Sequence, residues 1–169
     1  MSRAFVKEND MEDTAETPER PACPSPNYLT PRGFKKLHEE LADMRTQREA
    51  LLLTKDADLA AESQLRQVER DLRYLEQCVQ NAVMVESAGQ ARPDIRFGAS
   101  VTVIDEQGDS HEFTIVGEQE SCAPKGWISW ISPLAKSLLG HTVGDVVIWE
   151  RPAGNVELEI KDVSYPEVS

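Results

Sequence analysis

The stretch TPRGFKKLHEELADMRTQREAL, residues 30–51, decides how this chain folds. Thr30 and Pro31 form a helix start, because a threonine hydroxyl caps backbone N–H groups and proline at the first helical position loses no hydrogen bond. Large side chains then recur every three or four residues, the spacing of a coiled-coil seam. The members of this seam are Phe34, Leu37, Leu41, Met44, Arg48 and Leu51.

A second seam follows in the stretch LRQVERDLRYLEQCVQNA, residues 65–82. When its members are paired in reverse order with those of the first seam, from Phe34 with Ala82 to Leu51 with Leu65, each pair of residue numbers sums to 116. A constant sum predicts two antiparallel helices joined by a short turn centred on Asp58. At about 1.5 Å per residue, arms of about 18 residues project roughly 27 Å. The second seam contains Leu65, Val68, Leu72, Leu75, Val79 and Ala82.

The periodicity changes to two from Ile95 onward. The stretches ASVTVID, HEFTIVG, GWISWIS, DVVIWER and VELEIKDV are typical of short strands separated by turns. Before the fourth, Ser132 can cap a short helix that starts at Pro133 and ends at Gly140. The prediction is a compact antiparallel sheet with one helix, and an α+β fold overall. The predicted core contains Val101, Val103, Phe113, Ile115, Ile128, Leu134, Leu138, Leu139, Val146, Ile148 and Ile160.

The composition narrows the functional classes. The net charge is −12, and no basic face is evident, so a direct duplex binder is disfavoured and a protein partner is favoured. No apolar run approaches the roughly 20 residues that span a bilayer, so we expect a cytoplasmic protein without a membrane segment. Cys23, Cys78 and Cys122 have unrelated spacings, and we expect reduced thiols. His38, His111 and His141 are expected on the surface rather than at a metal.

These patterns predict three segments. Residues 1–28 carry six acidic and three basic side chains and are expected to form a flexible acidic tail. Residues 29–86 form the coiled-coil hairpin, and residues 92–166 form the sheet domain. Trp127 and Trp130 are expected on opposite faces of a strand, one packed inside and one exposed for a partner.

Three stretches resemble the GreA/GreB family of transcription elongation factors, and its GreB-like branch in particular. They are MSRAFVKE, NYLTPRGFKKLHEEL and, most specifically, SPLAKSLLGHTVGDVVIWERPAGNVELEI. The resemblance covers nearly the whole chain and implies an N-terminal antiparallel coiled coil followed by an FKBP-like domain. The seams and the change of period predict the same layout.

The resemblance also implies a function exerted on another enzyme. Gre factors dock their C-terminal domain at the rim of the RNA polymerase secondary channel and insert the coil toward the active site. An acidic tip there helps to hold a Mg²⁺ ion and activates the water that cleaves backtracked RNA, which is consistent with two-metal phosphoryl transfer. The chain is then a monomeric accessory factor that meets nucleic acid only within the transcription complex, and it has no cofactor of its own.

The family tip reads approximately Gly-Asp-Leu-x-Glu-Asn-Ala-Glu-Tyr. The best match places Asp58 on its first acid, as the candidate catalytic residue and Mg²⁺ ligand, but Ala61 falls where the second acid stands. Glu62, the second candidate, comes one position late, which turns its side chain by about 100° on a helix. Each arm is also shorter than usual by roughly one heptad, or about 10 Å of reach.

The resemblance implies that Ser132, Pro133 and Leu134 lie near the surface that docks on the polymerase. Family members often carry an acid just before this Ser-Pro pair, where this chain has Ile131. The preferred interpretation is a Gre-like factor that regulates elongation with weak or no transcript cleavage. The alternatives are a competent cleavage factor using Asp58 and Glu62, a peptidyl-prolyl isomerase or chaperone built on the sheet domain, and a structural coiled-coil adaptor.

Overall fold

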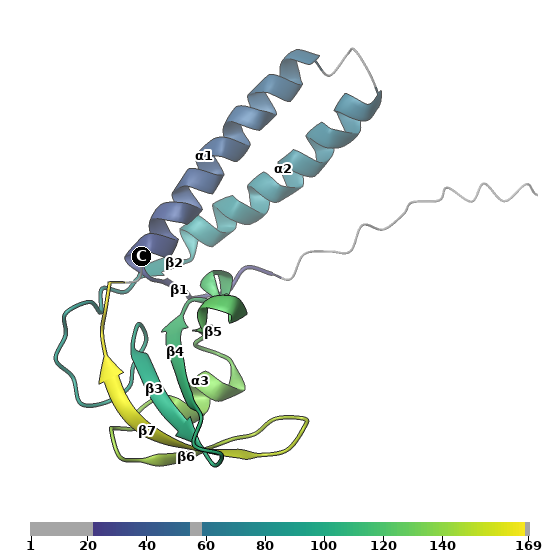
Figure 1. Cartoon of the computed structure of the whole chain (residues 1–169). Coiled ribbons are helices and arrows are strands. Elements are labelled where there is room, and N and C mark those ends of the chain that lie inside the picture. The colour runs from purple at the N-terminus through teal and green to yellow at the C-terminus, as the bar shows by residue number, and fades with distance from the viewer. Residues whose placement is uncertain (1–21, 55–58, 168–169) are drawn as a thin grey trace, which may run out of the picture.

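The computed structural model describes residues 22–54 and 59–167. Its N-terminal half is an antiparallel pair of helices that stands away from the rest of the molecule (Figure 1). At the base of the pair, the segment that leads into the first helix and the segment that follows the second form a two-stranded parallel sheet. The elements are β1 (Asn27–Leu29), α1 (Pro31–Thr54), α2 (Leu59–Gln80) and β2 (Ala82–Met84).

The helices pack through the two predicted seams. Leu37, Leu41, Leu65 and Leu75 are buried, and the apolar cluster is concentrated toward the base. Ion pairs also cross between the helices, Arg45 with Glu76 at 3.1 Å and the seam residue Arg48 with Glu69 at 3.4 Å. The stem of Arg48 therefore lies at the seam while its charged group reaches a partner at the surface.

The prediction of three reduced thiols is wrong for two of them. Cys23 and Cys78 form a disulfide with a Cα–Cα distance of 5.4 Å, and only Cys122 is a free thiol among the described residues. The two cysteines are 55 residues apart in the sequence. They meet because β1 pairs with β2 just after Cys78, a contact that cysteine spacing alone does not reveal.

The second half is a body built on a five-stranded sheet with the order β5-β4-β3-β7-β6. All neighbours are antiparallel except β4 and β5, which run parallel. The predicted α+β class, a helical hairpin followed by a sheet domain with one short α-helix, is confirmed. The elements are β3 (Ser100–Asp105), β4 (Ser110–Val116), η1 (Glu118–Glu120), η2 (Ala123–Lys125), β5 (Trp127–Ser129), α3 (Pro133–Leu138), β6 (Val146–Trp149) and β7 (Val156–Ser164).

The core of the body lies between α3 and the sheet, and most of its predicted members belong to it. Two do not, because Val146 and Ile148 are exposed while Val147 between them is buried. All four residues of β6 are apolar, so the sequence does not say which alternate set faces inward. Three of the predicted core residues are partly buried and pack against the core, namely Phe113, Ile128 and Leu139.

The two tryptophans differ in their surroundings, and both are half-buried. Trp130 packs against the core and meets the ring of Tyr28 edge-on, with 5.3 Å between ring centroids. The ring of Trp127 instead lies 4.6 Å from the guanidinium of Arg32 and 4.6 Å from the ammonium of Lys125. Trp127 therefore contacts cations from both the coil and the body.

Candidate functional site

The far end of the hairpin carries the predicted catalytic residues. Asp58 falls in residues 55–58, outside the described residues. Glu62 lies in the first turn of α2, exposed, and its Oε1 is 2.8 Å from the Nη1 of Arg66 one turn later. Ala61 beside it is half-buried. Of the two predicted acids, the one that the structure describes is thus neutralised by a neighbour on its own helix.

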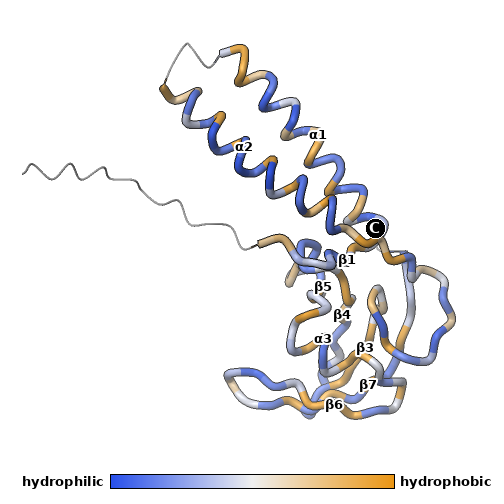
Figure 2. The backbone as a smooth tube through the Cα atoms, turned by 180° about the vertical axis from the view of Figure 1, so that it is seen from behind, coloured by the Kyte–Doolittle hydropathy of each residue, from blue (hydrophilic) through white to orange (hydrophobic). Residues whose placement is uncertain are grey.

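Two leucines flank the same end. Leu53, near the end of α1, is 89% exposed, and Leu59, the first residue of α2, is 82% exposed. In Figure 2, α2 begins in orange and α1 is orange just before its pale end. Exposed leucines are common singly, but a pair at the end of a projecting hairpin offers apolar contact to whatever receives it.

The described residues of the tip supply few ligands for a metal. Within residues 22–54 and 59–167, no three His, Cys, Asp or Glu side chains come together in a metal-binding group. A single carboxylate such as Glu62 does not hold Mg²⁺ by itself, since the ion takes most of its six ligands from water, phosphate and several carboxylates. The described part of the tip could therefore only add a ligand to an ion held elsewhere.

The opposite end of the coil is joined to the body by one carboxylate, that of Glu120. Its Oε2 accepts hydrogen bonds from the backbone N–H of Thr30 at 3.0 Å and of Gly117 at 3.1 Å, and its Oε1 contacts the Thr30 hydroxyl. Thr30 in turn accepts from the N–H of Gly33 through its hydroxyl, so it caps α1 as predicted. An acid from the body thus completes the start of α1, where negative charge is favourable.

Gly33 makes this contact sterically possible. A Cβ atom built on Gly33 would lie 2.2 Å from the carboxyl carbon of Glu120. The neighbouring Gln119 donates to the hydroxyl of Tyr74 at 3.1 Å and accepts from the amide of Asn27 at 3.3 Å. The segment η1 therefore contacts both helices and β1, which fixes the coil on the body.

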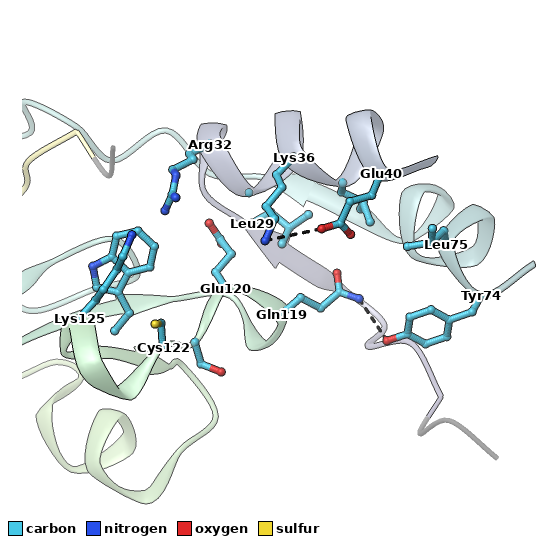
Figure 3. Close-up of a pocket in the computed structure, with 14 residues that line it drawn as sticks. Leu29, Arg32, Lys36, Glu40, Tyr74, Leu75, Gln119, Glu120, Cys122 and Lys125 are labelled. Atoms are coloured by element: carbon cyan, nitrogen blue, oxygen red, sulfur yellow. Dashed lines mark hydrogen bonds and ion pairs between the residues drawn. The ribbon is translucent and has the colours of Figure 1, made fainter. Parts of the chain in front are cut away.

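A cavity of about 570 Å³ opens beside this junction (Figure 3). Leu29, Leu37 and Leu75 contribute apolar side chains, and Lys36 pairs with Glu40 at 3.6 Å. The cationic groups of Arg32 and Lys125 lie near Trp127 at one end of the cavity, and Tyr74 lies at the other (Figure 3). Several of its polar groups contact residues of the same junction, as Gln119 does with Tyr74 and Glu120 with Thr30, and the cavity lies at the joint between coil and body.

The predicted docking residues lie at the start of α3. The Ser132 hydroxyl accepts from the N–H of Ala135 at 3.2 Å, and Pro133 is exposed at the first helical position. Leu134 is only 4% exposed and packs in the core. Ile131, just before them, is 39% exposed. The side chains available to a partner here are therefore those of Ile131, Ser132 and Pro133.

The three histidines are exposed, as predicted. His111 lies 2.9 Å from Asp105, and its hydrogen bond, together with the backbone N–H of Asp109, holds the pKa of that carboxyl below its usual value. The pKa of Asp145 is lowered first by the backbone N–H of Thr142 and also by His141. These pairs stabilise turns of the sheet.

Comparison with known proteins defines the class. Residues 90–165 match the family model described as "Transcription elongation factor, GreA/GreB, C-term". The chain is 34% identical over 152 residues to transcription elongation factor GreA of Halalkalibacterium halodurans, with 81% of this chain and 96% of that protein covered. It is 30% identical over 156 residues to GreB of Neisseria meningitidis, with 84% and 96% covered. The chain belongs to the GreA/GreB family of transcription elongation factors.

A solved structure is also similar in sequence. The GreA factor homolog 1 of Thermus thermophilus shares 26% identity, with 81% of this chain and 97% of that chain covered and a TM-score of 0.39. No helix in the described part of this chain is both long enough and apolar enough to cross a membrane.

The alignment with the Halalkalibacterium protein also shows that the aligned part of this chain is shorter than the aligned part of the relative. The 152 positions aligned with the Halalkalibacterium protein cover 81% of the 169 residues here, or about 137, so about 15 positions of the relative have no counterpart in this chain. This deficit is close to the two heptads predicted to be missing from the arms.

The sequence did not reveal the Glu120 contact, because Thr30 and Glu120 are 90 residues apart and a capping threonine gives no hint of a distant acid.

Proposed function

We propose that this chain is a regulator of transcription elongation that binds RNA polymerase, places its coil in the secondary channel and stimulates transcript cleavage weakly or not at all. The chain acts as an accessory factor, with the polymerase as the enzyme. The body docks through the start of α3, and the coil carries Asp58 toward the polymerase active site. Mg²⁺ belongs to that site, and Asp58 would offer it one carboxylate oxygen.

The main support for low cleavage activity is that the second acid of the family tip is missing from its usual position. Ala61 occupies the position that matches the second acid of the family tip, and Glu62, one position later, is paired with Arg66 at 2.8 Å. The exposed ion pair costs little to break, but to reach a metal Glu62 also has to turn by about 100° around the helix. Two-metal cleavage needs metal ions that stabilise both the attacking and the leaving oxygen, and one carboxylate holds an added ion less firmly than two.

The shorter length of the part aligned with the relative supports the same proposal. If the roughly 15 missing positions fall in the two arms, each arm loses about seven residues and the tip loses about 10 Å of reach. A Mg²⁺ ligand must lie within about 2.1 Å of the ion, so a carboxylate held several ångströms away has no direct effect on it. Occupation of the channel does not need that accuracy.

Competition for the polymerase tests channel binding. Backtracked elongation complexes are supplied with a cleavage-competent Gre factor and increasing amounts of this chain, and the cleaved 3′ RNA fragments are counted. We expect this chain to suppress the fragments in a dose-dependent way, and the variant Asp58→Asn to suppress them equally. If the chain neither cleaves nor competes, channel binding is wrong.

A second variant separates the two causes of weak cleavage. Ala61→Glu restores the second acid of the family pattern without changing the length of the coil. If chemistry limits cleavage, this variant raises the cleavage rate, whereas if reach limits cleavage the rate stays at the level of the unmodified chain. Gln64→Glu, which adds the same charge at an exposed position of the same helix turn, is the matched control.

A further inference from the structure

The cavity at the joint between coil and body holds two cations that no described acid pairs with. Arg32 comes from α1 and Lys125 from η2, and Figure 3 shows both side chains at one end of the cavity. Each cationic group lies 4.6 Å from the centre of the Trp127 ring, so the two charges are within about 9 Å of each other and repel. The ion pairs within residues 22–54 and 59–167 involve neither of them.

The two acids that line the same cavity are already engaged. Glu40 forms an ion pair with Lys36 at 3.6 Å. The carboxylate of Glu120 accepts two backbone N–H groups, at 3.0 and 3.1 Å, where the coil joins the body. The repulsion between Arg32 and Lys125 is therefore relieved only if another anion lies near both of them.

The sequence that precedes the described residues carries a matching charge. All six acidic side chains of residues 1–21 fall in the stretch ENDMEDTAETPE, residues 8–19, and this stretch contains no lysine or arginine. A run of carboxylates is complementary to a pair of cations without acidic partners. The charge pattern therefore makes this stretch, which we call the acidic stretch, a suitable occupant of the cavity.

The chain enters the described structure beside the same cavity. The disulfide fixes Cys23 to Cys78 of α2. The side-chain amide of Gln119 lies 3.2 Å from the sulfur of Cys78 and donates to the hydroxyl of Tyr74 at 3.1 Å. Gln119 and Tyr74 line the cavity, with Tyr74 at the end away from the two cations (Figure 3). The acidic stretch is therefore tethered at one end of the cavity, and the two cations lie at the other.

The acids nearest the tether are within reach of the cations. An extended chain covers about 3.3 Å per residue, and a compact volume of 570 Å³ is about 10 Å across. Glu19 is three residues before Ala22, the first described residue, so it can enter the cavity, and Glu16 can reach the far end. A short tether also gives the stretch an effective concentration on the order of mM, an advantage that no separate acidic ligand has.

We propose that the acidic stretch of this chain binds in this cavity, with the carboxylates of Glu16 and Glu19 beside Arg32 and Lys125. Arg32 belongs to the coil and Lys125 to the body, so the bound stretch bridges the two and restrains their joint. The contact involves no group of the polymerase. Its test is therefore independent of the proposed function.

The indole N–H signal of Trp127 in a nitrogen-15 NMR spectrum tests this contact. We expect the double variant Glu16→Gln with Glu19→Gln to shift this signal and the amide signals of Arg32 and Lys125. The difference from the unmodified chain should vanish at 1 M salt, where the Debye length falls to about 3 Å. Glu157→Gln with Glu159→Gln is the matched control.

This control removes the same charge from β7, beside β6 at the end of the body away from the coil (Figure 1). It should leave the three signals in place. Because Glu16 and Glu19 lie outside the described core, circular dichroism should show an unchanged fold in the double variant of the acidic stretch.

A charge reversal in the cavity tests which cations are involved. In a Lys125→Glu background, the substitutions at Glu16 and Glu19 should no longer shift the Trp127 signal, because the site has lost a cation and gained an acid. Lys136→Glu makes the same change at an exposed lysine of α3. In that background the shift should be retained in full.

Several results would overturn the proposal. One is a Trp127 signal that the substitutions at Glu16 and Glu19 leave in place, and another is an equal shift in the Lys125→Glu and Lys136→Glu backgrounds. A shift that disappears when the protein is diluted would show that the acidic stretch of a second copy occupies the cavity. If the substitutions have no effect but an added polyglutamate peptide moves the signal, the cavity binds a separate acidic partner and the tethered stretch is rejected.

Discussion

The base and the tip of the coil are built in opposite ways. At the base, Glu120 of the body completes the cap of α1, Gly33 leaves room for it, and the Cys23–Cys78 disulfide ties the chain entering the coil to α2. At the tip, the described residues offer two exposed leucines and one paired acid. Contacts between the coil and the body are therefore concentrated at the base, while the described residues of the tip present exposed side chains to a partner.

Removal of the disulfide should have the largest effect on stability. Cys23→Ser opens a loop of 55 residues, and a crosslink of this kind contributes about 2–4 kcal/mol to the free energy of unfolding. Denaturant unfolding under oxidising conditions measures the loss. With a reductant present the variant and the unmodified chain should unfold together, and Cys122→Ser should have little effect in either case. Equal midpoints under oxidising conditions would contradict a crosslinked base.

Gly33→Ala should be the next largest change, and its sign should depend on Glu120. With Glu120 present, the new methyl group meets the carboxyl group and costs about 1–3 kcal/mol. In a Glu120→Ala background the obstacle is gone, and alanine should stabilise the helix by up to about 1 kcal/mol relative to glycine. A double-mutant cycle of thermal unfolding measures this. The same sign in both backgrounds would mean that Glu120 does not occupy this position.

At the tip, substitution should affect function more than stability. Leu53→Ser and Leu59→Ser change exposed side chains, so the free energy of unfolding should move by no more than about 0.5 kcal/mol. Their ability to compete for polymerase should nevertheless fall by about tenfold if the leucines become buried in the channel. Unchanged competition by both variants would show that the tip makes no apolar contact there.

The ion pair at the tip should contribute least to stability. Arg66→Ala removes the partner of Glu62, and an exposed pair one helical turn apart contributes about 0.3–0.5 kcal/mol. Thermal unfolding should therefore shift only slightly. Arg45→Ala, which breaks an exposed pair between the helices, is the matched control. A loss above about 1 kcal/mol for Arg66→Ala would mean that the tip is more tightly built than its contacts indicate.

The sequence predicted the elements that repeat and missed those that depend on distant contacts. The two seams and the cap at Thr30 predicted the hairpin, because an amphipathic helix shows its period locally. The contact of Thr30 with Glu120 and the Cys23–Cys78 disulfide join residues far apart in the chain, and no local pattern marks them. In β6 the pattern itself was ambiguous, since four consecutive apolar residues have no period.

The site was predicted less completely than the fold. The symmetry of the seams predicted Asp58 at the turn, which lies outside the described residues, and the family pattern predicted Ala61 at the position of an acid. That Glu62 is engaged by Arg66 follows from their four-residue spacing on a helix, but such a pair forms only when both side chains adopt the right rotamers. The burial of Leu134 among the predicted docking residues depends on how α3 packs on the sheet.

The most direct test of the central claim is the rate at which backtracked RNA is shortened. Stalled, backtracked elongation complexes are incubated with this chain or with its Asp58→Asn variant, at concentrations that saturate competition, and the 3′ fragments are followed over time. We expect slow shortening, close to the rate of the polymerase alone, and little difference between the two proteins. Rapid shortening that Asp58→Asn abolishes would contradict it and identify the chain as a competent cleavage factor.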